Sequence, residues 1–389
     1  MSQGKLYRDR NLQLMFGVGL MSVMGVSSIS PAFPRIVEEL QISLTSVGML
    51  IVAFTLPSML LTPILGILAD RLGRKRVVVP CLFLFGLAGG ACALSQDFNM
   101  LIVLRVLQGI GAGGLSSLNQ AIISDIFSGQ RRAEALGLSA TVTSVGSTSY
   151  PLIGGALATL AWNYPFLLAL LAVPIGLLIL RFLHNPEPRS SVGLKEYLID
   201  TWGYLKHIRA IGAFAASIVG FILIYGVKLS YLSLYMGSHF HASPLVIGSI
   251  TSSISLTTAL AASQLGRLVK IMSVTSLAKI GFAVCAIALA LIPFMPRVEH
   301  VLIPTMIFGA GWGIISPSLQ TYVAGLAPSE HRAAFMSVNS TMFRVGQTLG
   351  PLIIGLAYVY GDFQGAFLFA AGLALATTIV GVIGGRIIR

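Results

Sequence analysis

Charged residues are scarce in this chain, and acidic residues are the scarcest of them. Aspartate, glutamate, lysine and arginine make up 10% of its 389 residues, whereas soluble domains carry about 25%. Hydrophobic residues make up 55%, and the net charge is +12. This composition excludes an ordinary cytosolic enzyme, a disordered chain and a nucleic-acid-binding domain, so no nucleic-acid partner is expected. The excess of basic residues must instead be tested as a sign of membrane topology.

Cysteine is almost absent, and the motifs of common enzymes are missing. Cys81, Cys92 and Cys285 lie inside apolar runs without paired spacing, which predicts small buried side chains rather than disulfides or a metal site. The sequence has no zinc-protease helix motif, nucleophile elbow or Walker loop. We therefore expect no enzymatic activity, no cofactor, no metal and no transport driven by ATP hydrolysed on this chain.

Long apolar runs fill most of the chain. A membrane helix needs roughly 20 predominantly apolar residues to cross the hydrocarbon. Twelve such runs predict an all-α membrane protein without a sizeable soluble domain. They cover residues 12–33, 45–68, 77–95, 99–124, 134–160, 164–183, 210–236, 245–268, 275–295, 300–325, 333–359 and 363–385.

The longest hydrophilic stretch separates two sets of six runs. It predicts an N-terminal six-helix bundle (1–183), a cytoplasmic linker (184–209) and a C-terminal six-helix bundle (210–389). Residues 194–208 are amphipathic and are expected to form an interfacial helix. With the N-terminus inside, 20 of the 25 lysines and arginines lie on the cytoplasmic side. The positive-inside rule then predicts that both termini are cytoplasmic.

The sequences of the two halves match each other at one constant offset in residue number. This offset relates Gly109 to Gly309. Chance matches at a single offset across five runs are very improbable. A parallel six-plus-six repeat is typical of transporter halves, with the substrate site between them near the bilayer midplane. The matches are Gly109, Gly111 and Gly113 with Gly309, Gly311 and Gly313; Ser116 with Ser316; Gln120 with Gln320; Gly146, Pro151 and Gly155 with Gly346, Pro351 and Gly355; Arg132 and Ala133 with Arg332 and Ala333; Gly66 with Gly266; and Gly48 with Gly248.

The loop between the second and third runs reads GILADRLGRKR (66–76). Membrane topology explains its basic residues, but it does not explain Asp70 at the membrane edge, the turn residue Gly73 or Gly66 one turn before the acid. This loop resembles the signature loop of the major facilitator superfamily, and the resemblance extends over essentially the whole chain. It implies a fold of twelve transmembrane helices in two pseudo-symmetric six-helix bundles.

The resemblance also implies a gating latch at this loop. Arg74 would pair with Asp125 at the end of the fourth span, and Asp70 would neighbour a helix of the other half. Such a latch forms only when the cytoplasmic side is closed. In the second half Lys270 stands at the position of Asp70, so the latch is expected on one side only. The alternative is that these are plain loop charges without a gating role.

Arg105 lies inside the fourth run, in the segment LRVLQGIGAGG (104–114). A charge at this depth is unfavourable and is by default functional. The segment resembles the superfamily's span-4 motif, which is associated with proton coupling in its antiporters. We therefore expect Arg105 to take part in substrate binding or coupling. For Gly109, Gly111 and Gly113 close packing against neighbouring helices is the favoured interpretation.

The fifth run contains the segment GSTSYPLIGG, from Gly146 to Gly155. It resembles a motif that the superfamily associates with exporters, except that a tyrosine replaces the glycine before Pro151. Pro151 removes a backbone hydrogen bond and is expected to kink the helix, and the flanking glycines let it approach a neighbour. The repeat copy (346–355) keeps that glycine as Gly350. The motif favours export.

No acidic residue lies near the middle of a predicted span, whereas Arg105, Lys228 and Arg344 lie inside spans. Cation exporters of the superfamily typically carry an acid in the cavity, so its absence argues against a lipophilic cation as substrate. Buried cations need an anion, carbonyl groups or water, and we expect an anionic substrate or coupling ion. For the two arginines hydrogen bonds to carbonyls remain the alternative. Arginine stays protonated, whereas a desolvated lysine can lose its proton, so Lys228 is the candidate proton switch.

Polar and aromatic residues around these cations are expected to line the cavity. Tyr225, Lys228 and Tyr231 are spaced by three, which places them on one face of an α-helix. A tyrosine belt at the membrane interface is the competing interpretation for Tyr225, Tyr231 and Tyr235. The remaining candidates are Asn119, Gln120, Gln320, Asn339 and Gln347.

The sequence thus predicts a secondary transporter resembling the drug/proton antiporter branch of the superfamily. It is expected to export a small molecule, drug-like or anionic, in exchange for protons, as a monomer in the lipid bilayer of a prokaryotic inner (plasma) membrane. The first alternative is uptake or exchange of an organic anion or a phosphorylated metabolite, which the buried cations favour. The second is a membrane sensor or scaffold, against which the retained pair of Asp70 and Arg74 speaks.

Overall fold

The computed structural model describes residues 6–184, 208–326 and 332–387, and these residues form helices without a strand. The first half contains α1 (Arg10–Ser27), α2 (Phe33–Glu39), α3 (Leu44–Leu72), α4 (Arg74–Cys92), α5 (Phe98–Ala112), α6 (Leu115–Ile126), α7 (Gly129–Leu160), α8 (Tyr164–Leu167) and α9 (Ala172–Phe182). The second half contains α11 (Ile208–Ile222), the π-helix η4 (Leu223–Tyr231), α12 (Leu232–Phe240), α13 (Pro244–Ser263), α14 (Leu265–Leu268), α15 (Val274–Leu291), α16 (Leu302–Leu326) and α17 (Arg332–Ile387).

Ten described helical stretches are long and apolar enough to cross a membrane. The last of them, Phe335–Val382, contains two helices, because the backbone is non-helical at Gly361 and Asp362. This break lies between the predicted spans 333–359 and 363–385. The helix α7 is 32 residues long but is not among the ten, and serine and threonine are frequent along it between residues 139 and 149. When α7 is added and Phe335–Val382 is counted as two helices, the described helices are consistent with the twelve predicted spans.

The fourth predicted span differs from expectation, because it is not one continuous helix. It divides at Gly113 and Gly114 into α5 and α6. The carbonyl of Gly113 accepts a hydrogen bond of 2.6 Å from Thr62 Oγ1 of α3. A side chain from a neighbouring helix thus satisfies a backbone group at the break, which is how a membrane helix tolerates such an interruption.

Polar side chains cap the first turns of several helices, and some of the few charged residues of the chain serve this purpose. The carboxylate of Asp9 accepts hydrogen bonds from the first turn of α1, and Asp97 accepts one of 2.8 Å from Met100 N in α5. Ser43 caps α3 in the same way, and its repeat partner Ser243 accepts one of 3.4 Å from Val246 N in α13. These side chains satisfy amide groups that would otherwise lack partners.

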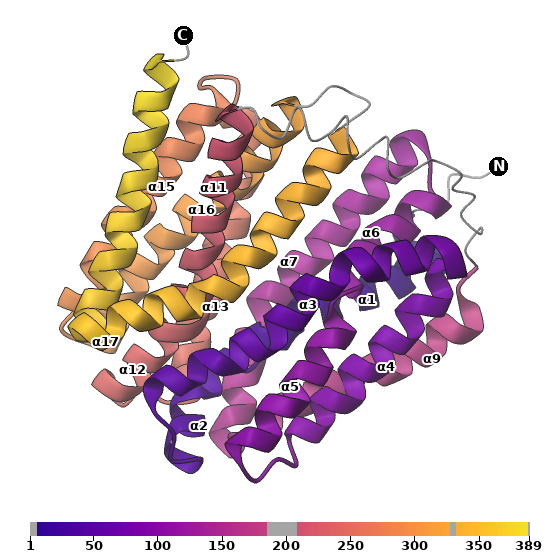
Figure 1. The fold of residues 1–389 in the computed structure, drawn as a ribbon, viewed down its shortest axis with the longest axis horizontal. Coiled ribbons are helices and arrows are strands. Elements are labelled where there is room, and N and C mark those ends of the chain that lie inside the picture. The colour runs from indigo at the N-terminus through magenta and orange to yellow at the C-terminus, as the bar shows by residue number, and fades with distance from the viewer. Residues whose placement is uncertain (1–5, 185–207, 327–331, 388–389) are drawn as a thin grey trace. The chain divides into compact units, whose positions relative to one another are not determined.

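The chain groups into two compact units. Unit 1 comprises Met1–Ser191 with Ser243–Gly248, and unit 2 comprises Val192–Ala242 with Ser249–Arg389. Figure 1 shows the helices of the first half in indigo to magenta and those of the second half in pink to yellow. Residues 185–207 of the predicted linker lie outside the described residues, so its amphipathic helix stays a prediction.

Glycines bring the helices of each unit into backbone contact. A Cβ at Gly109 of α5 would collide with the carbonyl of Phe54 in α3, and a Cβ at Gly309 of α16 would collide with that of Ile254 in α13. Phe54 and Ile254 are themselves related by the offset of the repeat, so the repeat extends to the packing partners. The packing interpretation of these glycines is therefore confirmed. The other contacts of the series are Gly111 with Cys81, Gly113 with Ser58, Gly311 with Gly281 and Gly313 with Thr258.

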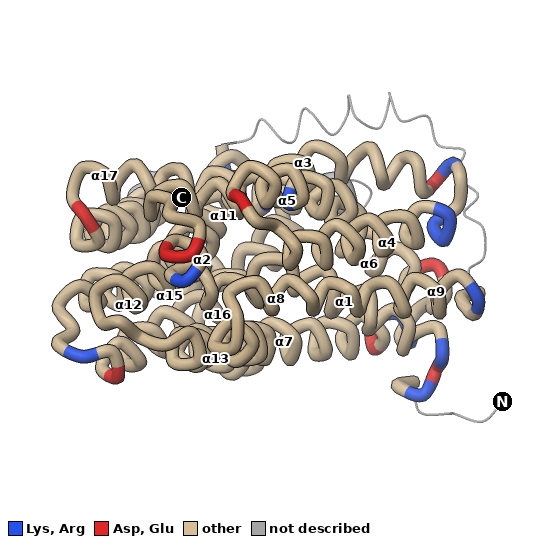
Figure 2. The backbone as a smooth tube through the Cα atoms, turned by 90° about the horizontal axis from the view of Figure 1, so that it is seen from below, with Lys and Arg blue, Asp and Glu red and all other residues tan. Residues whose placement is uncertain are grey.

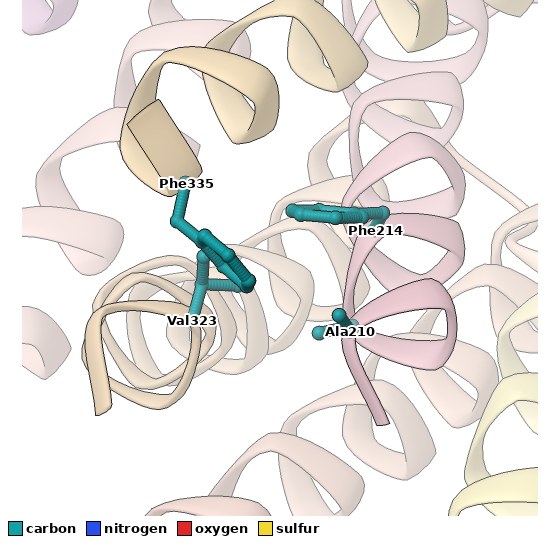
Figure 3. Packing of buried hydrophobic residues seen from close by; sticks show 5 residues of the cluster. Ala210, Phe214, Val323 and Phe335 are labelled. Atoms are coloured by element: carbon teal, nitrogen blue, oxygen red, sulfur yellow. The ribbon is translucent and has the colours of Figure 1, made fainter. Parts of the chain in front are cut away.

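Charged residues lie mostly at the ends of the helices, and long uncharged stretches run between them, as Figure 2 shows. Apolar side chains hold one end of unit 2 together. Phe214 of α11 and Phe335 of α17 lie with their ring centroids 6.2 Å apart, and Ala210 and Val323 complete the cluster (Figure 3). This cluster joins α11, α16 and α17.

Candidate functional site

The predicted ion pair of the signature loop is present. Arg74 begins α4, and its Nε pairs with Oδ2 of Asp125 near the end of α6. Its Nη2 also lies 3.3 Å from Asp70 Oδ1. Gly73 between α3 and α4 has a φ of 97°, which a residue with a Cβ rarely adopts. Gly66 has open space where a Cβ would stand, so packing within its own unit does not require a glycine there. The gating role of these residues stays a prediction.

Arg105 is fully buried and bound to the protein itself. Its Nε donates to the carbonyl of Leu50 in α3 at 3.1 Å, and its Nη1 donates to that of Gly25 in α1 at 2.9 Å and to Gln108 Oε1 at 2.7 Å. The guanidinium carbon lies 4.4 Å from the ring centroid of Phe54. These contacts fit the structural alternative, in which Arg105 ties α1, α3 and α5 together. A role in coupling remains a prediction.

Asn119 and Gln120 are neighbours in α6 but lie in different surroundings. Asn119 is buried and donates a hydrogen bond of 3.2 Å to Ser139 Oγ of α7, whereas Gln120 is exposed. Gln320, the repeat partner of Gln120, is also exposed and donates to Ser316 Oγ at 3.3 Å. The two glutamines therefore have side chains available to a ligand within their units, whereas Asn119 links two helices.

The sequence interpretation expected Asn339 to line the cavity. Its side chain instead lies fully buried between helices. Its Oδ1 accepts a hydrogen bond of 2.8 Å from Ser217 Oγ of α11. Asn339 is the repeat partner of Ser139, so each unit contains one buried bond between an asparagine and a serine. An amide in hydrocarbon needs such a partner, and the pairing was not foreseeable because the two residues lie far apart in sequence.

The segment with Gly146, Pro151 and Gly155 lies within α7, which remains helical through Pro151. All three residues are buried. A Cβ at Gly146 would lie 2.7 Å from Leu20 Cδ2 of α1, and one at Gly154 would collide with the carbonyl of Ser28. The expected close approach to a neighbouring helix is therefore present along α7 and α1.

The repeat copy of this motif packs against the helical stretch that carries Lys228. A Cβ at Gly346 of α17 would lie 2.5 Å from the carbonyl of Ile218 in α11, and one at Gly350 would lie 2.8 Å from Gly226 N of η4. A Cβ at Gly355 would lie 2.8 Å from the hydroxyl of Tyr231. Three glycines thus seat α17 against α11 and η4.

Tyr225, Lys228 and Tyr231 do not lie on an α-helix, which corrects the prediction that they share one face. Leu223–Tyr231 is a π-helix, whose i→i+5 hydrogen bonds widen the turn, so a spacing of three no longer aligns side chains. Lys228 Nζ donates to Ser255 Oγ of α13 at 2.8 Å, whereas Tyr231 packs against Tyr358 of α17 with tilted rings whose centroids lie 5.4 Å apart. Their neighbours are different helices.

The interfacial belt interpretation is wrong for Tyr231 and Tyr235. Both side chains are buried in the protein, and Tyr235 packs against Phe363 and Phe367 at centroid distances of 5.4 and 5.3 Å. A belt residue would instead present its ring to the lipid. Tyr225 is partly exposed and interacts electrostatically with Arg344 of α17, so this tyrosine and this arginine come together as candidate site residues.

Sequence reasoning missed an aromatic cluster beside Tyr225. Phe221 of α11 stacks on Phe343 of α17 with ring centroids 4.4 Å apart and meets Trp312 of α16 edge-on at 5.4 Å. Tyr225 lies 6.3 Å from Phe221. A usable signal existed, because Phe343 directly precedes Arg344 and Trp312 lies between the repeat glycines. The rings nevertheless come from three separate helices, which only the fold brings together.

The described aspartates and glutamates lie within the terminal two turns of helices or between helices. The described residues also contain no group of three histidine, cysteine or acidic side chains that could hold a metal ion. The polar chemistry inside the described spans is therefore that of cations, hydroxyls, amides and aromatic rings.

Comparison with known proteins assigns the family. The family model described as Major Facilitator Superfamily matches residues 15–233 and 216–385. The chain belongs to the Major Facilitator Superfamily. It is accordingly a multi-pass membrane transporter with the major facilitator fold, and it is not an enzyme.

Two relatives within the superfamily match almost the full length. The chain is 24% identical over 374 residues to the quinolone resistance protein NorA of Staphylococcus aureus, covering 94% of each chain. It is 27% identical over 375 residues to multidrug resistance protein 1 of Bacillus subtilis, covering 92% of this chain and 93% of the relative. Among solved structures, a variant of the nucleoside transporter NupG has the same fold, with a TM-score of 0.83, 15% identity and coverage of 96% and 99%. These relatives place the chain among major facilitators that include drug-resistance proteins.

Proposed function

We propose that this major facilitator is a secondary transporter that exports a small organic molecule, drug-like or anionic, in exchange for protons. The observation that carries the proposal is the match to two resistance proteins over more than nine tenths of the chain. The exporter-type segment at Gly146–Gly155 supports the same direction. Transport would occur by alternating access, with the two halves moving about a site near the midplane.

The orientation is part of this proposal. The basic residues of the sequence support a protein with both termini in the cytoplasm of a bacterial cell, because 20 of the 25 lysines and arginines then lie inside. We propose a monomer, because a single chain already contains both halves of the six-plus-six repeat. The domains are proposed as two six-helix bundles, 1–183 and 210–389, joined by the linker 184–209.

A second candidate is uptake or exchange of an organic anion or a phosphorylated metabolite. Lys228 favours it, because its ammonium group contacts a neutral hydroxyl, Ser255 Oγ, and no carboxylate of the described residues lies within ion-pair distance. An uncompensated cation inside a membrane protein is stabilised by an anionic ligand. This candidate shares the site with the first and differs in direction and coupling.

Transport assays in everted membrane vesicles separate the candidates. Export in exchange for protons predicts that an inside-acid pH gradient drives a substrate into the vesicles and that a protonophore abolishes this uptake. Vesicles without the protein are the control. Counterflow that proceeds equally without a gradient would support the exchange candidate instead. If none of the drug-like, anionic and phosphorylated compounds moves, both proposed substrate classes are wrong.

A further inference from the structure

The aromatic cluster of unit 2 has the form of a ring-binding surface. Phe221 stands at its centre, with Phe343, Trp312 and Tyr225 around it at 4.4, 5.4 and 6.3 Å between ring centroids. All four side chains are partly exposed although they lie within helices that are long enough to span a membrane. Phe335 in the apolar cluster of the same unit is by contrast buried. Partial exposure leaves ring faces and edges available to a further aromatic group.

Two cations lie on the same helical stretches as these rings. Lys228 lies three residues after Tyr225 within η4, and Arg344 directly follows Phe343 in α17 and interacts electrostatically with Tyr225. The described acids lie elsewhere, near helix ends. A ligand that reaches these rings therefore meets positive charge beside them.

The helix that contacts Lys228 carries a buried hydroxyl group without a partner. Lys228 Nζ donates to Ser255 Oγ of α13 at 2.8 Å. Ser252 lies one turn earlier on α13 and is 8% exposed, and its Oγ has no hydrogen-bond partner among the described residues. Buried hydroxyls are normally paired. An ammonium group bonded to one serine hydroxyl, with a second serine one helical turn away, offers donors of the kind that an anionic oxygen pair requires.

Phe221 and Lys228 lie on one continuous helical stretch, formed by α11 and η4. A ligand that engages both needs an aromatic part for the rings and an acidic group for the lysine. A phosphorylated sugar would leave the rings without a partner.

We infer that unit 2 contains a binding site for aromatic anions, in which the rings stack against Phe221, Trp312 and Phe343 and the acidic group binds Lys228 with the hydroxyls of Ser252 and Ser255. The inference rests on the proposed function in that the bound molecule is the transported one, and it specifies the substrate class as aromatic carboxylates. The positive charge of Lys228 and Arg344 disfavours aromatic cations.

Equilibrium binding to the purified full-length protein in detergent tests the site with three matched probes. 2-Naphthoate carries both features, 2-naphthamide has the same rings without the charge, and cyclohexanecarboxylate has the charge without the aromatic rings. Naphthoate is expected to bind at least about tenfold more tightly than either of the others. Equal binding of naphthoate and naphthamide would overturn the inference.

Variants test the charged part and the aromatic part of the site separately. Lys228→Gln should remove the roughly tenfold preference for naphthoate over naphthamide, whereas Phe221→Leu should weaken both aromatic probes alike. Lys228→Arg, which keeps the charge, should retain the preference. Lys270→Gln is the matched control, because Lys270 is an exposed lysine of the same unit. A Lys228→Gln protein that unfolds at the wild-type temperature and still prefers naphthoate would contradict the proposed role of Lys228.

The outcomes also separate this site from the proposed function. Naphthoate that binds with dependence on Lys228 but is not moved by a pH gradient leaves the site standing and removes proton-coupled export. Gradient-driven export of other compounds without any naphthoate binding supports the export proposal and removes the aromatic-anion site. Binding needs no gradient, so the two measurements fail independently.

Discussion

Arg74 of α4 forms an ion pair with Asp125 of α6, and only 16% and 22% of the two side chains are exposed. Because both side chains are largely withdrawn from water, each charge depends on its partner for compensation. It holds the Arg74 guanidinium beside Asp70, which is 47% exposed and lies 3.3 Å away. Arg74 thus lies between two acids, and the exposed one, Asp70, has a free side for a further contact, as a latch would need.

Asp70→Asn tests the latch. Transport is expected to slow roughly fivefold or more, because a coupling contact between conformational states typically has an energy of about 1 to 3 kcal/mol. Ligand affinity measured in detergent should stay nearly unchanged. Asp97→Asn is the control, since asparagine can also cap α5. Equal losses of affinity and rate in the Asp70 variant would assign Asp70 a structural role.

Arg105→Lys tests the structural interpretation of Arg105. Lysine cannot reproduce the simultaneous bonds to Leu50, Gly25 and Gln108, and each hydrogen bond of a charged group contributes about 1.5 to 3 kcal/mol. The unfolding temperature of the ligand-free protein should therefore fall clearly. The matched variant is Arg35→Lys, because the bonds of Arg35 to Ala158 and Thr159 lie nearer the surface. The unfolding temperature of this variant should fall less. Lost transport at an unchanged unfolding temperature would instead indicate a direct role in coupling.

Gly309→Ala tests the backbone contact between α16 and α13. Because the new Cβ would collide with the carbonyl of Ile254, we expect a destabilisation of about 1 to 3 kcal/mol. Gly212→Ala in α11 meets open space and should stabilise the helix by about 0.5 to 1 kcal/mol. Thermal unfolding of both variants measures the difference, and equal effects would show that the contact is not tight.

The buried bond between Ser217 and Asn339 can be measured with a double-mutant cycle. Ser217→Ala, Asn339→Leu and the double variant should give a coupling energy of about 0.6 kcal/mol, with an upper value near about 1.7 kcal/mol, as for other hydrogen bonds between membrane helices. Unfolding by denaturant in mixed micelles is the measurement. Purely additive losses would indicate that the hydrogen bond contributes nothing net.

Lys228→Arg tests whether Lys228 is the proton switch. Arginine keeps its proton throughout the accessible pH range, so transport by this variant should lose its dependence on pH while an anionic ligand still binds. Rates in proteoliposomes at several external pH values measure this. Wild-type pH dependence in the variant would exclude Lys228 as the titrating group and leave it as an anion ligand.

Sequence reasoning reached the features that local patterns encode. Apolar runs located the helices, including the boundary near Gly361, because each span must be apolar along its own length. Close packing was predicted for Gly109, and the structure shows the same contact at Gly309, its partner in the repeat. The resemblance of the signature loop paired Arg74 with Asp125, although 51 residues separate them.

Other features had no local pattern to predict them. The partners of Arg105 are mainly backbone carbonyls, which every residue possesses and no side-chain pattern marks. The π-helix at Leu223–Tyr231 has the same apolar composition as an α-helix, so hydropathy does not distinguish i→i+4 from i→i+5 bonding. The wrong helix type then placed Tyr225, Lys228 and Tyr231 on one face.

The sequence by itself determined that the chain lies in a membrane, where its apolar segments run and which few charges fall inside them, because the bilayer imposes those demands on each segment separately. Tertiary structure alone decided what each buried charge contacts. Arg105 is bound by carbonyl groups of α1 and α3, whereas Lys228 donates to the hydroxyl of Ser255 in α13. The reason is that a buried cation must be satisfied by whichever groups neighbouring helices supply, and that supply is set by the packing of segments distant in sequence.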